Sequence, residues 1–203
     1  MYRISASIAI AATAWCLGAM PAAAGLVGSP MGLRPVLQHI KFDAPALPPM
    51  AYNRFCHRYE AECRSHPLFR GGPVRLTPER QKDLKQVNET VNRGITPARV
   101  DYEEAEEAWL LNPSRGDCND YAVSKRHELL NRGWPARVLL LSEVVVPNGQ
   151  HHLVLVIRTT DGDLVLDNLT PQIRPWARAP YRWVRMQLPN SSKLWTTIAD
   201  RKV

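Results

Sequence analysis

The fold and the chemistry of this chain are both indicated by one stretch, Arg115-Gly116-Asp117-Cys118-Asn119-Asp120-Tyr121-Ala122. Asp117 is a typical N-cap and Asp120 gives an acidic first turn, so the pattern predicts a helix that begins at Cys118 and ends near Gly133. The free N–H groups of a helix start stabilise a thiolate, which predicts a lowered pKa for the Cys118 thiol. A cysteine here is also a common small packing residue, so the motif alone assigns no chemistry.

Two further polar side chains stand at the ends of predicted β-strands. Apolar, β-branched runs flank the turn signal Asp161-Gly162 and predict an antiparallel hairpin. Alternation along the strands places His152 and Asp167 on one face and His151 on the other. A tight turn at Asp161-Gly162 would leave His152 and Asp167 roughly 13 Å apart, so a contact between them requires a turn centred near Thr159-Thr160 or a bulge.

A thiol, an imidazole and a carboxylate in this chain order are the parts of a cysteine acyl-transfer site. Cys118 would attack a carbonyl carbon to form a thioester acyl-enzyme, His152 would move the proton, and Asp167 would orient the ring. The sequence therefore predicts a cysteine peptidase. Two alternatives stay open: a transglutaminase or other acyltransferase with the same triad, and a non-catalytic exported binding module on the same scaffold.

Helix signals come first along the chain and strand signals follow. Thr77-Pro78-Glu79 predicts a helix start, with the helix ending near Gly94, and residues 101–111 form an acidic amphipathic run. Beyond Pro135 the apolar residues change to the pattern of strands. The predicted strands are 138–146, 152–158, 164–167 and 181–186. This order predicts an α+β fold, with N-terminal helices and the nucleophile at a helix start packed on an antiparallel β-sheet.

The N-terminal residues differ in composition from the rest of the chain. Residues 1–24 carry Arg3, an apolar stretch and a final Pro-Ala-Ala-Ala, which predicts a cleaved secretory signal peptide and a periplasmic or secreted location. No later run is long and apolar enough for stable membrane insertion after cleavage. Residues 25–50 are rich in Pro and Gly and predict an extended arm without a core of its own. Residues 51–203 fit one domain.

Charge and cysteine content limit the partners and the compartment. The formal net charge is +7, but the basic residues are scattered and do not alternate with stacking aromatics, which argues against a nucleic-acid partner. Cys56, Cys63 and Cys118 remain beyond the signal segment, so at least one of them lacks an intramolecular partner. Cys56 and Cys63 would lie roughly 10 Å apart in one regular helix, so a disulfide between them requires a turn. The paired and the reduced state both stay open.

The motifs in combination resemble the bacterial transglutaminase-like cysteine peptidases. The resemblance covers roughly residues 85–200. It rests on Gly116 to Ala122, Arg132-Gly133-Trp134-Pro135, His152 to Leu155 and Leu164 to Leu169, together with Asn88, Asn92, Asp101 and Trp109. It implies a papain-like, transglutaminase-like fold, export to the periplasm and a triad made of Cys118, His152 and Asp167.

The same resemblance implies a cofactor and partners. The best-known members of that family bind calcium beside the nucleophile and clip a large surface adhesin, so it implies a protein substrate such as an adhesin; we also expect a regulatory protein. Carried over by position, the calcium ligands are Asp117, Asn119 and Asp120. Those members have Glu where this chain has Asn119. An amide oxygen still ligates calcium, but the lost charge weakens a site for a hard cation.

Overall fold

A computed structural model describes residues 39–64, 71–98 and 108–199 of the chain. The predicted signal peptide (1–24) and most of the predicted arm lie outside the described residues, as does most of the acidic run at 101–111. Its last four residues, 108–111, are not helical. Within the described residues, no helix has the length and apolar character needed to cross a bilayer.

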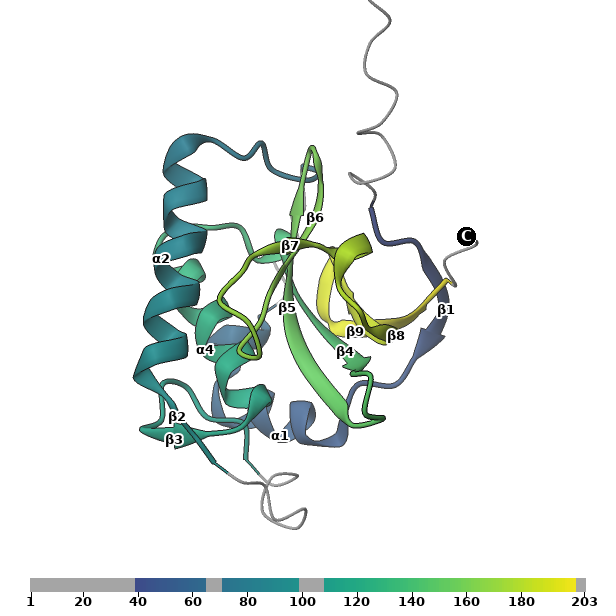
Figure 1. Ribbon diagram of the computed structural model, residues 1–203. Coiled ribbons are helices and arrows are strands. Elements are labelled where there is room, and N and C mark those ends of the chain that lie inside the picture. Colours follow the sequence, from purple (N-terminus) through teal and green to yellow (C-terminus); the bar gives the residue numbers. More distant parts are fainter. Residues whose placement is uncertain (1–38, 65–70, 99–107, 200–203) are drawn as a thin grey trace, which may run out of the picture. The chain divides into compact units, whose positions relative to one another are not determined.

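Helices and an antiparallel sheet make up the described part of the chain (Figure 1). The helices are α1 (Met50–Arg58), α2 (Pro78–Gly94) and α4 (Cys118–Asn131), with short 3-10 turns η1 (Glu60–Cys63), η2 (Ala136–Val138) and η3 (Trp176–Arg178). The strands are β1 (Phe42–Ala46), β2 (Thr96–Pro97), β3 (Arg115–Gly116), β4 (Leu139–Val145), β5 (His151–Thr159), β6 (Gly162–Leu166), β7 (Arg174–Pro175), β8 (Arg182–Leu188) and β9 (Ser191–Ile198). The α+β prediction is confirmed.

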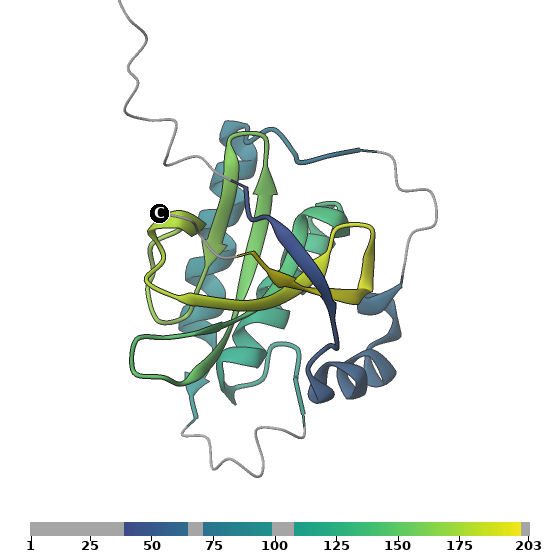
Figure 2. The same ribbon diagram turned by 90° about the vertical axis from the view of Figure 1, so that its right-hand side faces the viewer.

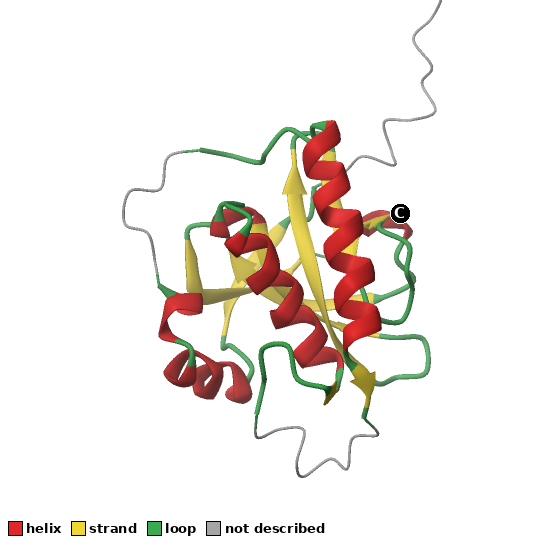
Figure 3. Ribbon diagram, turned by 90° about the vertical axis from the view of Figure 1, so that its left-hand side faces the viewer, coloured by secondary structure: helices red, strands yellow, loops and turns green. Residues whose placement is uncertain are grey.

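The main sheet has the strand order β1-β9-β8-β4-β5-β6-β7, and its neighbouring strands are antiparallel. Helices α2 and α4 lie side by side across one face of this sheet (Figure 3). Leu153, Leu155 and Ile157 of β5 face the helices, whereas Val154 and Val156 face a second core around Trp176 and Met186. Both faces of β5 are therefore buried, which explains its continuous apolar sequence.

Strands β1 and β9 and helix α1 were not predicted from the sequence. Strand β1 pairs with β9 at one edge of the sheet, and this edge is turned toward the viewer in Figure 2. It contains Pro45, a residue that edge strands tolerate because one side of the strand needs no ladder hydrogen bonds. The end of the Pro-rich arm thus extends the sheet, and Ile40 just before β1 is buried in the second core.

Cys56 and Cys63 form a disulfide, with their Cα atoms 5.5 Å apart. Helix α1 ends at Arg58, and the chain turns at Tyr59 into η1. A turn between the two cysteines is what this pairing requires, since one regular helix would hold them too far apart. Cys118 is consequently the free cysteine of the described residues.

Candidate active site

The start of α4 is built by a reciprocal pair of aspartates. The Asp117 carboxylate accepts hydrogen bonds from the backbone N–H of Asn119 (2.8 Å) and Asp120 (3.4 Å), and the Asp120 carboxylate accepts one from the backbone N–H of Asp117 (3.0 Å). This capping box starts the helix at Cys118, as predicted. Gly116 is needed just before it, because a Cβ there would overlap the Asp120 carboxylate and lie 2.8 Å from the Asp120 Cβ.

The Cys118 thiol is half-buried and packs against the core on the helix side of the sheet. Burial raises the pKa of this thiol to about 12, although a hydrogen bond from the backbone N–H of Leu153 to the sulfur opposes the rise. The nearby charge of Asp117 raises the pKa further. The prediction of a lowered thiol pKa is therefore wrong for this conformation, because desolvation outweighs the stabilisation that a helix start provides.

His152 and Asp167 are in direct contact. The Nε2 of His152 and the Oδ1 of Asp167 are 2.8 Å apart, and both side chains are buried. The hairpin turn lies at Thr160-Asp161, one residue earlier than the predicted turn at Asp161-Gly162, since Thr159 pairs with Gly162. If this register is extended, Asp167 lies opposite Val154 and on the same face of the sheet as His152. His152 is then the diagonal neighbour of Asp167, at a distance that an imidazole can bridge.

Tyr181 completes the surroundings of the carboxylate and was not predicted from the sequence. Its hydroxyl donates a hydrogen bond to Oδ2 of Asp167, and its ring meets the His152 ring edge-on, with centroids 6.0 Å apart. The backbone N–H of Leu169 donates to Oδ1 (3.0 Å). Burial raises the pKa of Asp167, but the hydrogen bond and charge of His152 outweigh it, with Tyr181 and Leu169 adding to the effect, and the pKa falls to about 2.

Cys118 lies close to this pair without bonding to it. Its sulfur contacts the backbone N–H of Leu153, the residue after His152, so the helix start and the strand carrying His152 meet here. In the described part of the chain, no hydrogen bond joins the sulfur to the imidazole. The structure thus joins two of the three predicted catalytic side chains directly, and the triad as a whole stays a prediction. His151, the rejected neighbour, is exposed and points to Glu143 instead.

The predicted calcium ligands Asp117, Asn119 and Asp120 lie together on the first turn of α4. Burial raises the pKa of Asp120 to about 6, and the adjacent charge of Asp117 contributes, so a cation here would relieve an unfavourable cluster of negative charge. Two carboxylates and an amide oxygen suit a hard cation such as Ca²⁺. No group of three or more His, Cys, Asp or Glu side chains in the described residues could hold a metal ion, so the proposed set depends on the Asn119 amide.

Comparison with known proteins identifies relatives of the chain. The family description "bacterial transglutaminase-like cysteine proteinase" matches residues 43–203. Calcium-bound LapG of Legionella pneumophila is similar in fold, with 24% sequence identity and a TM-score of 0.52 over 64% of this chain and 76% of LapG. A second LapG structure matches with 24% identity and a TM-score of 0.51, over 63% and 73% of the two chains. No curated protein matches the chain.

Proposed function

Because the chain belongs to the bacterial transglutaminase-like cysteine proteinases, we propose that it is an exported peptidase in which Cys118, His152 and Asp167 act together. One observation carries the proposal beyond family membership. A buried imidazole–carboxylate pair, 2.8 Å apart, stands beside the helix start that bears the free cysteine of the described residues. A nucleophile, a base and an orienting group are the parts that acyl transfer from a peptide requires.

The direction of proton transfer follows from the hydrogen bonds of the His152 ring. Asp167 is held ionised, so its Oδ1 accepts a hydrogen bond from Nε2–H and leaves Nδ1 as the basic nitrogen of the neutral ring. Tyr181 fixes the other carboxylate oxygen. Because burial raises the pKa of the Cys118 thiol, we propose that Nδ1 takes the thiol proton as substrate binds, when catalytic hydrogen bonds shorten.

The remaining steps restore the enzyme. The sulfur attacks the peptide carbonyl carbon, and the developing oxyanion accepts a hydrogen bond from the backbone N–H of Cys118, since the cap uses the amides of Asn119 and Asp120. The His152 imidazolium then protonates the leaving amine, and a thioester remains on Cys118. Water, activated by the same ring, releases the acyl group and frees the thiol.

We further propose that calcium and an adhesin-like surface protein belong to this function. The oxygens of Asp117, Asn119 and Asp120 would hold the ion, in keeping with the calcium-bound state of the LapG structure. A bound Ca²⁺ would place positive charge at the helix start and favour the thiolate form of Cys118. The family implies a protein substrate; the resemblance noted from the sequence narrows it to a surface adhesin, cleaved outside the cytoplasm.

The test is cleavage of a proteome-derived peptide library, with new peptide ends identified by mass spectrometry. We expect cleavage by the wild-type protein with Ca²⁺ present, and at least a 1,000-fold loss in Cys118→Ala and His152→Ala, since the nucleophile and base act as a unit (about 10³-fold or more). His151→Ala is the matched control and should keep wild-type activity, because its side chain is exposed and points away from the site. Full activity in Cys118→Ala would refute the proposal.

A labelled primary amine separates the peptidase from the acyltransferase with the same triad. Hydrolysis leaves free carboxyl ends, whereas transfer attaches the amine to the acyl group. We expect no incorporation of the amine into library peptides. Incorporation that depends on Cys118 and exceeds hydrolysis would replace the peptidase by an acyltransferase. The absence of both products with Ca²⁺ present would instead favour a binding module.

A further inference from the structure

Lys125 is a buried cation that the proposed mechanism leaves unexplained. It lies on α4, two turns after Cys118, and only 1% of its surface is exposed to solvent. Its ammonium lies over the Tyr121 ring, 6.0 Å from the centroid. Among the described residues it has no hydrogen bond or salt bridge, although an ammonium carries three donors and is costly to bury without acceptors.

Three buried amide oxygens lack donors. They are Oδ1 of Asn88, Asn92 and Asn168. The Nδ2 groups of Asn88 and Asn92 are used: they donate to the backbone carbonyls of Pro171 (3.1 Å) and Asp167 (2.9 Å). The two asparagines of α2 therefore hold the segment that begins with the Asp167 carboxylate. Their free oxygens require a donor, because such a buried acceptor typically costs about 1–3 kcal/mol when unpaired.

The packing of α2 against α4 places Lys125 at the level of these asparagines. The two helices lie side by side (Figure 3), and the hydrogen bonds near their two ends show that they run antiparallel. The Tyr121 hydroxyl donates to the Ile95 carbonyl near one end, and Arg132 donates to Asp83 near the other. Counting residues between these two contacts sets Lys125 opposite the turn that runs from Asn88 to Asn92.

The charge of Asp167 also acts on Lys125. Burial lowers the pKa of Lys125 to about 7, and the Asp167 carboxylate is the charge that opposes this decrease. The Lys125 ammonium therefore lies at the level of two acceptors that lack donors, Oδ1 of Asn88 and Asn92, and near enough to Asp167 for its charge to act. The third such acceptor, Oδ1 of Asn168, belongs to the residue next to Asp167. The three donors of one ammonium match these three acceptors in number.

We propose that Lys125 is a positioning residue that holds Asp167 in place, by donating through ordered water to the oxygens of Asn88, Asn92 and Asn168. The ammonium ties the two helices to the segment 167–171, and that segment carries the carboxylate that orients His152. The expected effect on turnover rests on the proposed function. The expected effect on the hydrogen bond between His152 and Asp167 does not.

The first experiment removes the ammonium with Lys125→Met in the full chain. Proton NMR of protein with ¹⁵N-labelled histidine follows the His152 Nε2 proton, which the Asp167 carboxylate protects from exchange. We expect at least tenfold faster exchange of this proton, a tenfold lower kcat on a cleaved library peptide, and a KM within twofold of wild type. Lys85→Met, which removes an exposed ammonium from the neighbouring helix, should change none of these. Unchanged exchange in Lys125→Met would overturn the inference.

A double-mutant cycle tests the contact without any enzyme assay. Asn168→Asp adds a buried carboxylate, which a facing ammonium would tolerate and an apolar neighbour would not. We expect Asn168→Asp to destabilise the protein more in the Lys125→Met background than in the wild-type background. The increase in the unfolding equilibrium constant should be at least tenfold larger in Lys125→Met. Additive effects within twofold would contradict the inference.

If Lys125→Met does not fold, Asn168→Asp alone decides: a melting temperature at or above that of wild type supports a facing ammonium, and a clear decrease opposes it. A wild-type protein without peptidase activity, but with the expected exchange and coupling, would remove the proposed function and leave the role of Lys125 standing.

Discussion

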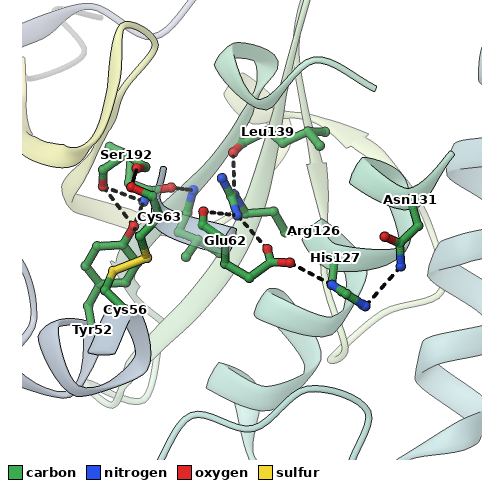
Figure 4. Close-up of polar contacts among 11 residues, drawn as sticks. Tyr52, Cys56, Glu62, Cys63, Arg126, His127, Asn131, Leu139 and Ser192 are labelled. Atoms are coloured by element: carbon green, nitrogen blue, oxygen red, sulfur yellow. Dashed lines mark hydrogen bonds and ion pairs between the residues drawn. A yellow bond between two sulfur atoms is a disulfide. The ribbon is translucent and has the colours of Figure 1, made fainter. Parts of the chain in front are cut away.

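Replacing Arg126 with methionine is expected to lower the free energy of unfolding by about 3–5 kcal/mol, because it leaves the Glu62 carboxylate buried without its main cation. The guanidinium of Arg126 contacts Oε2 of Glu62 at 2.8 Å, and the two side chains are 3% and 8% exposed. Arg126 also donates to the backbone carbonyls of Glu62 (2.9 Å) and Leu139 (3.2 Å). Figure 4 shows this guanidinium between η1 and the start of β4.

The magnitude follows from burial rather than from the distance between the charges. Arg132, at the C-terminal end of the same helix, pairs with Asp83 at 3.0 Å, but these side chains are 29% and 33% exposed. An exposed pair of this kind contributes only about 0.2–1 kcal/mol. Arg132→Met is therefore the matched control. The double variant Glu62→Met/Arg126→Met removes both charges and should recover most of the stability that Arg126→Met loses.

Urea unfolding followed by tryptophan fluorescence measures all three variants under conditions that keep the disulfide intact. The unfolding slope should stay constant, so that the midpoints report stability. Equal losses in Arg126→Met and Arg132→Met would refute the reasoning, since burial would then have no effect. So would a double variant that is less stable than Arg126→Met.

Three further outcomes are expected. Replacing Cys56 and Cys63 by serine opens a loop with a sequence separation of 7 and should cost about 2.5 kcal/mol in urea unfolding; an unchanged midpoint would contradict this. The pKa of Asp167 is lowered from 3.8 to about 2, so its contribution to stability is complete above about pH 4 and disappears as the pH falls through 2. Acid titration of Asp167→Asn should therefore show a weaker loss between pH 4 and 2 than wild type, and parallel curves would argue against the carboxylate. Gly116→Ala should cost about 1–3 kcal/mol in thermal unfolding because its Cβ meets the helix cap, whereas Gly94→Ala, with open space around it, should not.

The start of α4 could be predicted from sequence because its determinants are local. Asp117 and Asp120 cap each other's backbone within three residues, so the capping box is visible in the order of residues. The hairpin of β5 and β6 was predicted for a similar reason, since alternation alone puts His152 and Asp167 on one face. The turn position was wrong by one residue, because Gly162 was assigned to the turn, whereas it pairs with Thr159.

Other features of the site depend on contacts between distant parts of the chain. Tyr181 reaches Asp167 from the start of β8, a strand that is separated from β6 by β4 and β5 in the sheet. The raised pKa of Cys118 comes from the surrounding core, whereas the sequence shows only the favourable helix start. The burial of Lys125 likewise depends on α2 packing against α4.

The amino-acid sequence by itself determined where α4 starts, which faces of the strands carry His152 and Asp167, and which family the motifs resemble. Hydrogen-bond caps and strand alternation act over a few residues, so they can be seen in the order of side chains. Only the tertiary structure decided the contact of Tyr181 with Asp167, the raised pKa of the Cys118 thiol and the burial of Lys125. Desolvation and long-range contacts depend on which segments pack together, and no local pattern encodes that.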